Sequence, residues 1–391
     1  MVTEPLSMSL SSKKEYLGRI HGRYQRAGRE HKGKILDEFC AVCGYHRKFA
    51  LRLLNRPLNS RRRKSGPKRR YDPQKLLPVL KPIWLAAEQP CGKLLKVLLP
   101  VWTSFLPGLD PALKKELLAM SAATLDRLLK PARFQHRRRG LCATRPGKRL
   151  RHHIPLRDGP PDTRHLGHIE ADTVAHCGDS VAGDFVYTLT FTDVCTGWTE
   201  NRATWNKSAH GIRDQLRDIE GKLPFKMKSF HADNGSEFLN WPLWEYLRGP
   251  KRKVKFTRSR AYRKNDNAHV EQKNWTQVRQ LFGHERFEHA SLVPLMNRVY
   301  ASWNLLRNHF HPTFKLKSKE KRGSRYIRRY EVPRTPYQRL LASPGLSPLA
   351  KHQLKEKHQQ LNPFMVKKQV EQELKIFFTA LGNLNREATN P

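Results

Sequence analysis

The chain has 391 residues and a formal net charge of +41. Self-repulsion on that scale opposes a compact state unless a polyanion relieves it, and the common polyanions are nucleic acids and membrane surfaces. No stretch has the roughly 18 uncharged apolar residues that a membrane-spanning helix needs, and the N-terminus lacks the apolar core of a secretory signal. We therefore expect a cytoplasmic protein that associates with the nucleoid through its partner, DNA.

The chain has six cysteines, which are too few for a disulfide framework in a chain of this length. Cys40 and Cys43 form a C-x-x-C pair inside a helix-like segment, and no second ligand pair follows at zinc spacing. We interpret both as small core residues in a protein of a reducing compartment.

Residues 12–57 predict a helix-turn-helix domain. Apolar residues recur every four positions from Tyr16 to Tyr24, as on one face of a helix. A second apolar segment follows, then a break at Gly44 and a last helix over Tyr45–Asn55. A recognition helix needs basic donors for phosphates and guanine edges, although a solvated helical face is the alternative. The donors here are Arg47, Lys48 and Arg52.

A basic arm is expected over residues 58–70, suited to lie along a groove or a phosphate backbone. Its consecutive cations are Arg61, Arg62, Arg63 and Lys64. Residues 71–131 predict a second helical, helix-turn-helix-like domain, in which Ser121 caps a reading helix that Pro131 ends. Residues 132–161 are rich in Arg, Pro, Gly and His, and we interpret them as a basic linker that touches DNA.

An α/β domain is predicted over residues 162–310, where strand patterns alternate with helical ones. The expected strands span 166–174, 185–192, 198–205, 227–232 and 254–258, and the expected helices span 208–221, 238–247 and 265–282. The first strand is placed near the centre of the sheet. Residues 311–391 predict a basic C-terminal region in which Tyr326 and Tyr330 interleave with Lys and Arg, typical of a nucleic-acid surface. The last forty residues are polar and give no signal.

Three acids stand out in this basic chain. Asp172 lies within an apolar strand, where an acid has to be paired or liganded. Asp233 ends another strand before Asn-Gly, and Glu271 lies on the helix that follows. Taken singly, Asp233 is typical of a turn and Glu271 of a solvated helix. Together they suit phosphoryl transfer with two divalent metal ions, which needs clustered carboxylates.

The segments around these acids resemble the integrase catalytic core, the ribonuclease-H-like domain of DDE transposases and retroviral integrases. They are 169–173, 231–238 (His-Ala-Asp-Asn-Gly-Ser-Glu-Phe) and 260–274. The whole chain is similar to bacterial insertion-sequence transposases of the ISNCY type, including Arg-Thr-Pro-Tyr-Gln-Arg-Leu over 334–340. The gap between Asp233 and Glu271 holds 37 residues, close to the family's spacing. Ala232 stands where the family often has Ser or Thr.

The resemblance implies a mixed five-stranded sheet with flanking helices. It also implies that Asp172, Asp233 and Glu271 are the catalytic acids and bind two Mg²⁺ or Mn²⁺ ions. Water would cut the end of the element, and the resulting 3′-hydroxyl would attack target DNA without a covalent protein intermediate. Two ends have to meet, so a homodimer or larger multimer on DNA is expected. A nuclease without strand transfer and a catalytically silent DNA-binding regulator are the alternatives.

Other acids could replace a member of the triad. Glu170 alternates onto the face of Asp172, Asp193 fits a hairpin turn, and Glu237 and Asp266 border the motifs. We rank all four below the triad. DNA contacts near the site are expected from Lys264, Lys273 and Asn274, for which simple surface charge is the alternative.

Overall fold

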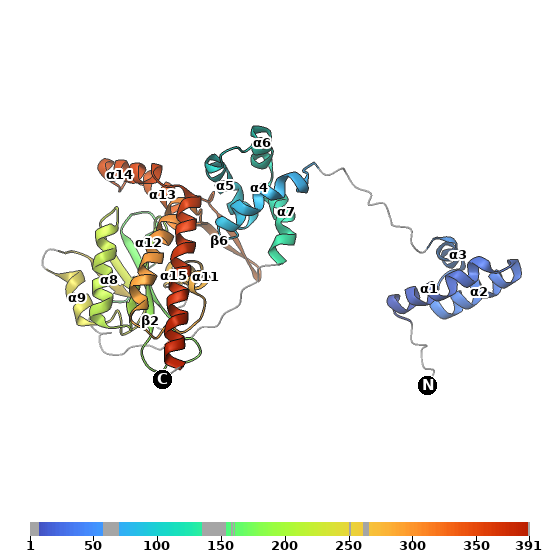
Figure 1. Ribbon diagram of the computed structural model, residues 1–391, viewed down its shortest axis with the longest axis horizontal. Helices are drawn as coiled ribbons and strands as arrows, with labels where there is room; N and C mark the ends of the chain where they lie inside the picture. The colour runs from blue at the N-terminus through green and yellow to red at the C-terminus, as the bar shows by residue number, and fades with distance from the viewer. Residues whose placement is uncertain are drawn as a thin grey trace. The chain divides into compact units, whose positions relative to one another are not determined.

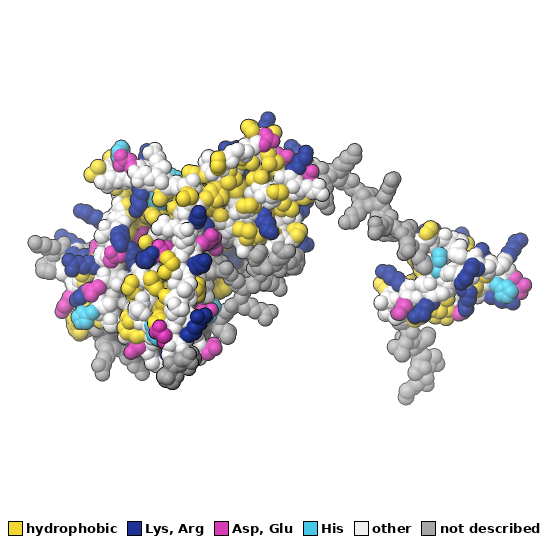
Figure 2. Space-filling model, in the orientation of Figure 1, with side chains coloured by type: hydrophobic (Ala, Val, Ile, Leu, Met, Phe, Trp, Pro, Cys, Tyr) yellow, Lys and Arg dark blue, Asp and Glu magenta, His cyan; other side chains and the backbone are white. Residues whose placement is uncertain are grey.

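The computed structural model describes residues 8–57, 70–134, 154–157, 159, 161–249, 252–260 and 266–389. It has two compact units, Met1–Arg70 and Tyr71–Pro391 (Figure 1). Within the described ranges, no helix combines the length and the apolar character needed to span a bilayer. Lys and Arg are spread over the surfaces of both units, and on the face shown in Figure 2 apolar side chains gather over α4 to α6.

The described part of the first unit, residues 8–57 and 70, contains the helices α1 (Leu10–Arg26), α2 (Arg29–Cys43) and α3 (Arg47–Asn55). The turn between α2 and α3 depends on Gly44, whose φ of +65° is readily adopted by glycine. The helices share a small core in which Phe39 is fully buried, and Cys43 lies in it while Cys40 packs against it.

The second unit opens with four helices, α4 (Pro73–Ala86), α5 (Gly92–Trp102), α6 (Pro111–Ala119) and α7 (Ala122–Phe134), with a 3₁₀ turn at Thr103–Phe105. Ser121 caps α7 as expected, since its Oγ accepts from the Thr124 N–H at 3.2 Å. Pro131 does not end this helix but lies inside its last turns.

These four helices do not form a separate body, in contrast to the domain expected over 71–131. Their apolar side chains share one core with α12 (Leu292–Phe310) and α15 (Pro363–Thr389). Trp102 is fully buried and lies 5.0 Å, ring to ring, from Phe364. The last forty residues are therefore structural. α15 packs along α12 (Figure 1), and its buried side chains are Val366, Val370, Phe377 and Leu381.

The central sheet has the order β3-β2-β1-β4-β5. Its strands are β1 (His168–Ala175), β2 (Val186–Asp193), β3 (Thr199–Trp205), β4 (Ser229–Ala232) and β5 (Lys255–Arg258). The first three are antiparallel neighbours, whereas β4 and β5 run parallel to β1. This order and these directions confirm the expected α/β, ribonuclease-H-like core with a mixed five-stranded sheet and β1 at its centre.

Helices cover both faces of the sheet. α8 (Ala209–Lys222) and α9 (Trp241–Arg248) enclose a core with Ile169, Ala171 and Phe230. The opposite face, which carries Glu170 and Asp172, is covered by α10 (Ala268–Lys273), a π-helical segment Asn274–Arg279, α11 (Gln280–Phe282) and α12.

Asparagines of α12 bind the edge strand β3. The Asn308 side chain accepts from the Thr199 N–H (2.9 Å) and donates to the Thr199 carbonyl (2.8 Å). Asn297 does the same for Ala203, at 2.7 and 3.1 Å. These side chains satisfy backbone groups that would otherwise remain open at the edge of the sheet.

The chain then forms a hairpin of β6 (Leu316–Arg322) and β7 (Arg325–Tyr330), followed by α13 (Pro336–Ala342), α14 (Pro348–Gln359) and α15. A capping box between Thr335 and Gln338 starts α13. The basic C-terminal region expected over 311–391 therefore divides into an exposed hairpin and a helical part that supports the core.

Candidate active site

Asp172 lies on the central strand β1, and Asp233 directly follows the neighbouring parallel strand β4. Ala171 of β1 pairs with Ala232 of β4, so the two aspartates are the next residues along these strands. Neighbouring strands lie about 4.8 Å apart. The register therefore brings together two acids that are 61 positions apart in the sequence.

The Asp172 carboxylate is held from two sides. One oxygen accepts from the Thr173 N–H at 2.8 Å and the other from the Asn274 side-chain amide at 2.6 Å. Burial, followed by the charge of Asp233, raises the pKa of Asp172 to about 7. Such a carboxyl is poised to exchange a proton for a cation near neutral pH.

Asp233 begins the loop after β4 and accepts from the Gly235 N–H at 2.9 Å. Burial, followed by the charge of Glu237, raises the pKa of Asp233 to about 6. The Glu237 side chain is buried and accepts from the Thr173 hydroxyl at 2.9 Å, and Lys207 lies 3.8 Å away. A Cβ at Gly235 would come within 2.5 Å of the Glu237 carboxyl carbon, so a larger residue there would displace the Glu237 carboxylate.

Glu271 is exposed on α10, whose start is fastened to β1. The Asn267 side chain donates to the Ala171 carbonyl at 3.1 Å, and the His269 N–H donates to Glu170 at 3.0 Å. The charge of Glu271 contributes to the raised pKa values of both Asp172 and Asp233. The three predicted acids are therefore within electrostatic reach of one another.

Three of the competing acids have structural partners. Glu170 is buried and pairs with Arg157 at 3.0 Å. Asp193 is buried and accepts hydrogen bonds from the Gly167 N–H and from the N–H and hydroxyl of Thr196 in its own turn. Asp266 pairs with Arg260 at 2.8 Å. Glu237 is the competing acid that lies beside the predicted triad.

The donors present fit a hard divalent cation. Carboxylate oxygens are the ligands that Mg²⁺ and Mn²⁺ prefer, and a cation would relieve the repulsion that raises the pKa values of Asp172 and Asp233. In the described residues, no three His, Cys, Asp or Glu side chains already form a group that could hold a metal ion.

The predicted DNA contacts near the site have partners inside the protein. The Lys273 amine donates to the Gly197 carbonyl at 3.4 Å. Burial, with smaller contributions from Arg307 and Arg339, lowers the pKa of Lys273 to about 7. Asn274 orients Asp172, as described above. Contact of either residue with DNA stays a prediction, and Lys264 lies outside the described residues.

In the first unit, Arg47 pairs with Asp37, whereas Lys48 and Arg52 are exposed on α3. Arg61, Arg62, Arg63 and Lys64 lie outside the described residues.

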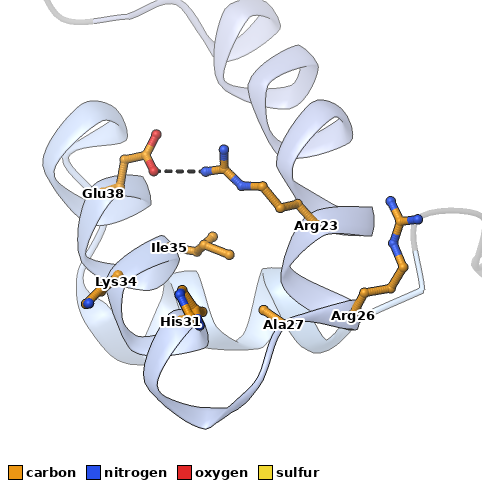
Figure 3. Close-up of a pocket in the computed structure, with 7 residues that line it drawn as sticks. All are labelled: Arg23, Arg26, Ala27, His31, Lys34, Ile35 and Glu38. Carbon is orange, nitrogen blue, oxygen red and sulfur yellow. Dashed lines mark hydrogen bonds and ion pairs between the residues drawn. The ribbon is translucent and has the colours of Figure 1, made fainter.

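A hollow between α1 and α2 is lined by further basic side chains, as Figure 3 shows. Its lining residues are Arg23, Arg26, Ala27, His31, Lys34, Ile35 and Glu38, with Arg23 and Glu38 paired at 2.9 Å.

The raised pKa of Asp172 predicts a pH-dependent stability difference. An unfolded Asp has a pKa of about 3.9, so the folded protein binds this proton more tightly. The resulting stabilisation is present below about pH 4 and is lost as the pH rises through about 7. In EDTA, the free energy of unfolding of wild type minus that of Asp172→Asn should fall by roughly 2–4 kcal/mol between pH 4.5 and 8. Urea titrations measure this difference, and a flat difference would contradict the assigned environment.

Comparison with known proteins shows which family the chain belongs to. No family model matches the chain. The catalytic core domain of BIV integrase, a crystal structure, is similar with 13% identity and a TM-score of 0.27, over 45% of this chain and 93% of that one. A likeness of that size does not bear on function, and the fold assignment stands on the strand order. The y4rM protein of Sinorhizobium fredii strain NGR234, described as uncharacterized, is 37% identical over 349 residues, covering 85% of this chain and 96% of the relative. The chain therefore belongs to the family of this y4rM protein.

Proposed function

We propose that the chain is a metal-dependent DNA transposase of the DDE type, similar to the ISNCY transposases of bacterial insertion sequences. The observation that carries the proposal is the placement of Asp172 on β1 beside Asp233 at the end of β4, with Glu271 on the helix fastened to β1. The net charge of +41 supports a polyanionic substrate.

Asp172, Asp233 and Glu271 would hold Mg²⁺ or Mn²⁺, with two ions expected. The metal would activate the attacking oxygen and stabilise the leaving oxygen of a phosphodiester. Asn274 orients the Asp172 carboxylate, and Asn267 fixes the start of the helix that carries Glu271. These contacts keep the acids in place before DNA arrives, which lowers the cost of organising the site.

The test uses the full chain and labelled duplexes that carry inverted repeats flanking the gene, with a supercoiled plasmid as target. Reactions contain Mg²⁺, Mn²⁺ or EDTA. Joining of the cut end to the plasmid, dependent on metal, is the expected result. Cutting without joining would indicate the nuclease, and binding without cutting would indicate the regulator; either outcome would overturn the transposase proposal. Sedimentation of the complex with two ends measures whether a dimer or larger multimer forms.

A further inference from the structure

The β6–β7 hairpin stands out from the second unit with exposed side chains along both strands, apart from the half-buried Ser318. Among the described strands, β6 and β7 pair only with each other. Two-stranded hairpins are at best marginally stable in water when they have no further layer to pack on. An exposed hairpin of this kind gains stability from whatever binds it.

Toward its tip, one side of the hairpin is cationic and aromatic. The register pairs Lys319 with Arg328 and Lys321 with Tyr326, and these four residues form what we call the basic face. Like charges directly opposite each other destabilise a hairpin. Lys319–Arg328 is such a pair on this side, and Arg322–Arg325 is such a pair on the other side. The Lys319 amine also lies 4.6 Å from the centre of the Tyr326 ring.

The other side of the hairpin is partly neutralised. It carries Arg322, Arg325 and Arg329, but it also carries Glu320, whose carboxylate lies 3.4 Å from the Arg322 guanidinium. This side has as many arginine and lysine residues as the basic face, and it has an acid that would repel phosphate. The two sides therefore form a matched pair that differs in net charge.

The base of the hairpin is anchored to the turn that follows β2. The Lys315 amine donates to the carbonyls of Thr163 (2.7 Å) and Cys195 (2.9 Å). Arg339 donates to Thr313, where the chain enters the hairpin.

The same turn touches the helix that carries Glu271, since Gly197 accepts from the Lys273 amine. A Cβ at Gly197 would lie 3.7 Å from that amine and 3.9 Å from the Thr313 hydroxyl. The root of the hairpin and the helix of the candidate site are therefore held on one turn.

We propose that the basic face of the hairpin binds the phosphate backbone of duplex DNA, beside the point where the site acts. A two-stranded ribbon is an element that enters the major groove or follows its edges, and the cations of the basic face complement the phosphates. This proposal depends on the proposed function in one respect, that DNA is the substrate. The basic face is proposed to bind double-stranded DNA, and a preference for single-stranded DNA would overturn the proposal.

The experiment measures binding of the full chain to a fluorescent random-sequence duplex from 50 to 300 mM KCl in EDTA. Each phosphate contact contributes about 0.9 to the slope of log K against log salt. K319Q/K321Q/R328Q should reduce the slope by about 2.7, and the matched variant R322Q/R325Q/R329Q by less than about 1. Equal changes in both variants, or an unchanged slope in the first, would overturn the proposal. Circular dichroism melts check that both variants keep the wild-type fold.

Two further arms separate the possible failures. A single strand of the same sequence should bind the wild-type chain more weakly than the duplex does. Substitution of the basic face should also reduce the affinity for the single strand less than the affinity for the duplex. Binding in EDTA requires no chemistry, so a chain that shows the slope change but does not cut DNA would refute the proposed function and leave the hairpin proposal standing. A chain that joins DNA with an unchanged slope would refute the hairpin proposal alone.

Discussion

Asp172→Asn is expected to reduce metal-dependent DNA cleavage by roughly a thousandfold or more, which corresponds to about 4 kcal/mol of transition-state stabilisation. The substitution preserves shape and removes the charge that would hold a cation. Asn is neutral, so Asp233 and Glu271 alone would have to balance the positive charge of the metal ions. End-labelled duplexes resolved on denaturing gels measure the rate. Asp233→Asn and Glu271→Gln should behave alike.

The matched control is Asp214→Asn, which removes an exposed acid of α8 that pairs with the neighbouring Arg213. It should cleave at the wild-type rate. DNA binding by all four variants should stay within a few-fold of wild type, because the net charge of +41 dominates non-specific affinity. Mn²⁺ binding followed by electron paramagnetic resonance should weaken in the three active-site variants and not in the control. Full activity of any active-site variant would remove that acid from the assignment.

Phe377→Ala is expected to destabilise the second unit by about 3–5 kcal/mol. The Phe377 ring is fully buried between Phe282 (5.1 Å between ring centres) and Phe287 (5.0 Å), where its loss would leave a cavity. The adjacent Phe378 is 38% exposed, so Phe378→Ala should cost less than about 1.5 kcal/mol. Comparable losses in the two variants would contradict the packing of α15.

Urea unfolding followed by tryptophan fluorescence measures this difference cleanly. All 8 tryptophans lie between positions 84 and 303, so the signal reports the second unit alone. Phe282 ends the helical segment that begins with the helix of Glu271. Cleavage by Phe377→Ala should therefore also fall at temperatures where the unit is still folded.

Local patterns in the sequence were sufficient to predict the sheet. The alternation of Phe185, Tyr187, Leu189 and Phe191 predicts a strand, and β2 covers Val186–Asp193. Gly44 predicts the turn between α2 and α3, because glycine readily adopts the left-handed backbone conformation found there. The assignment of the three candidate acids depended on motifs, and the closeness of Asp172 and Asp233 follows from the parallel register of β1 and β4.

What the sequence did not reveal depends on partners far away along the chain. The apolar face of α15 is broken by charged residues and has no visible partner until α12 lies beside it. Likewise, Lys273 looks like surface charge until the turn at Gly197 buries its amine. The helix expected over 265–282 contains a π-helical stretch at Asn274–Arg279, a hydrogen-bond shift that side-chain periodicity does not signal.

The hydrogen bonds from α12 to β3 limit how copies of this protein could associate. At the other border of the sheet, Arg258 of β5 exchanges backbone hydrogen bonds with Pro155 and Arg157, each at 3.0 Å. Part of each border is thus already occupied, which discourages a second chain from extending the sheet by adding its own strand. An assembly that brings two DNA ends together would consequently be built through helices, loops or the DNA itself, and its formation would depend on DNA length and salt rather than on strand pairing.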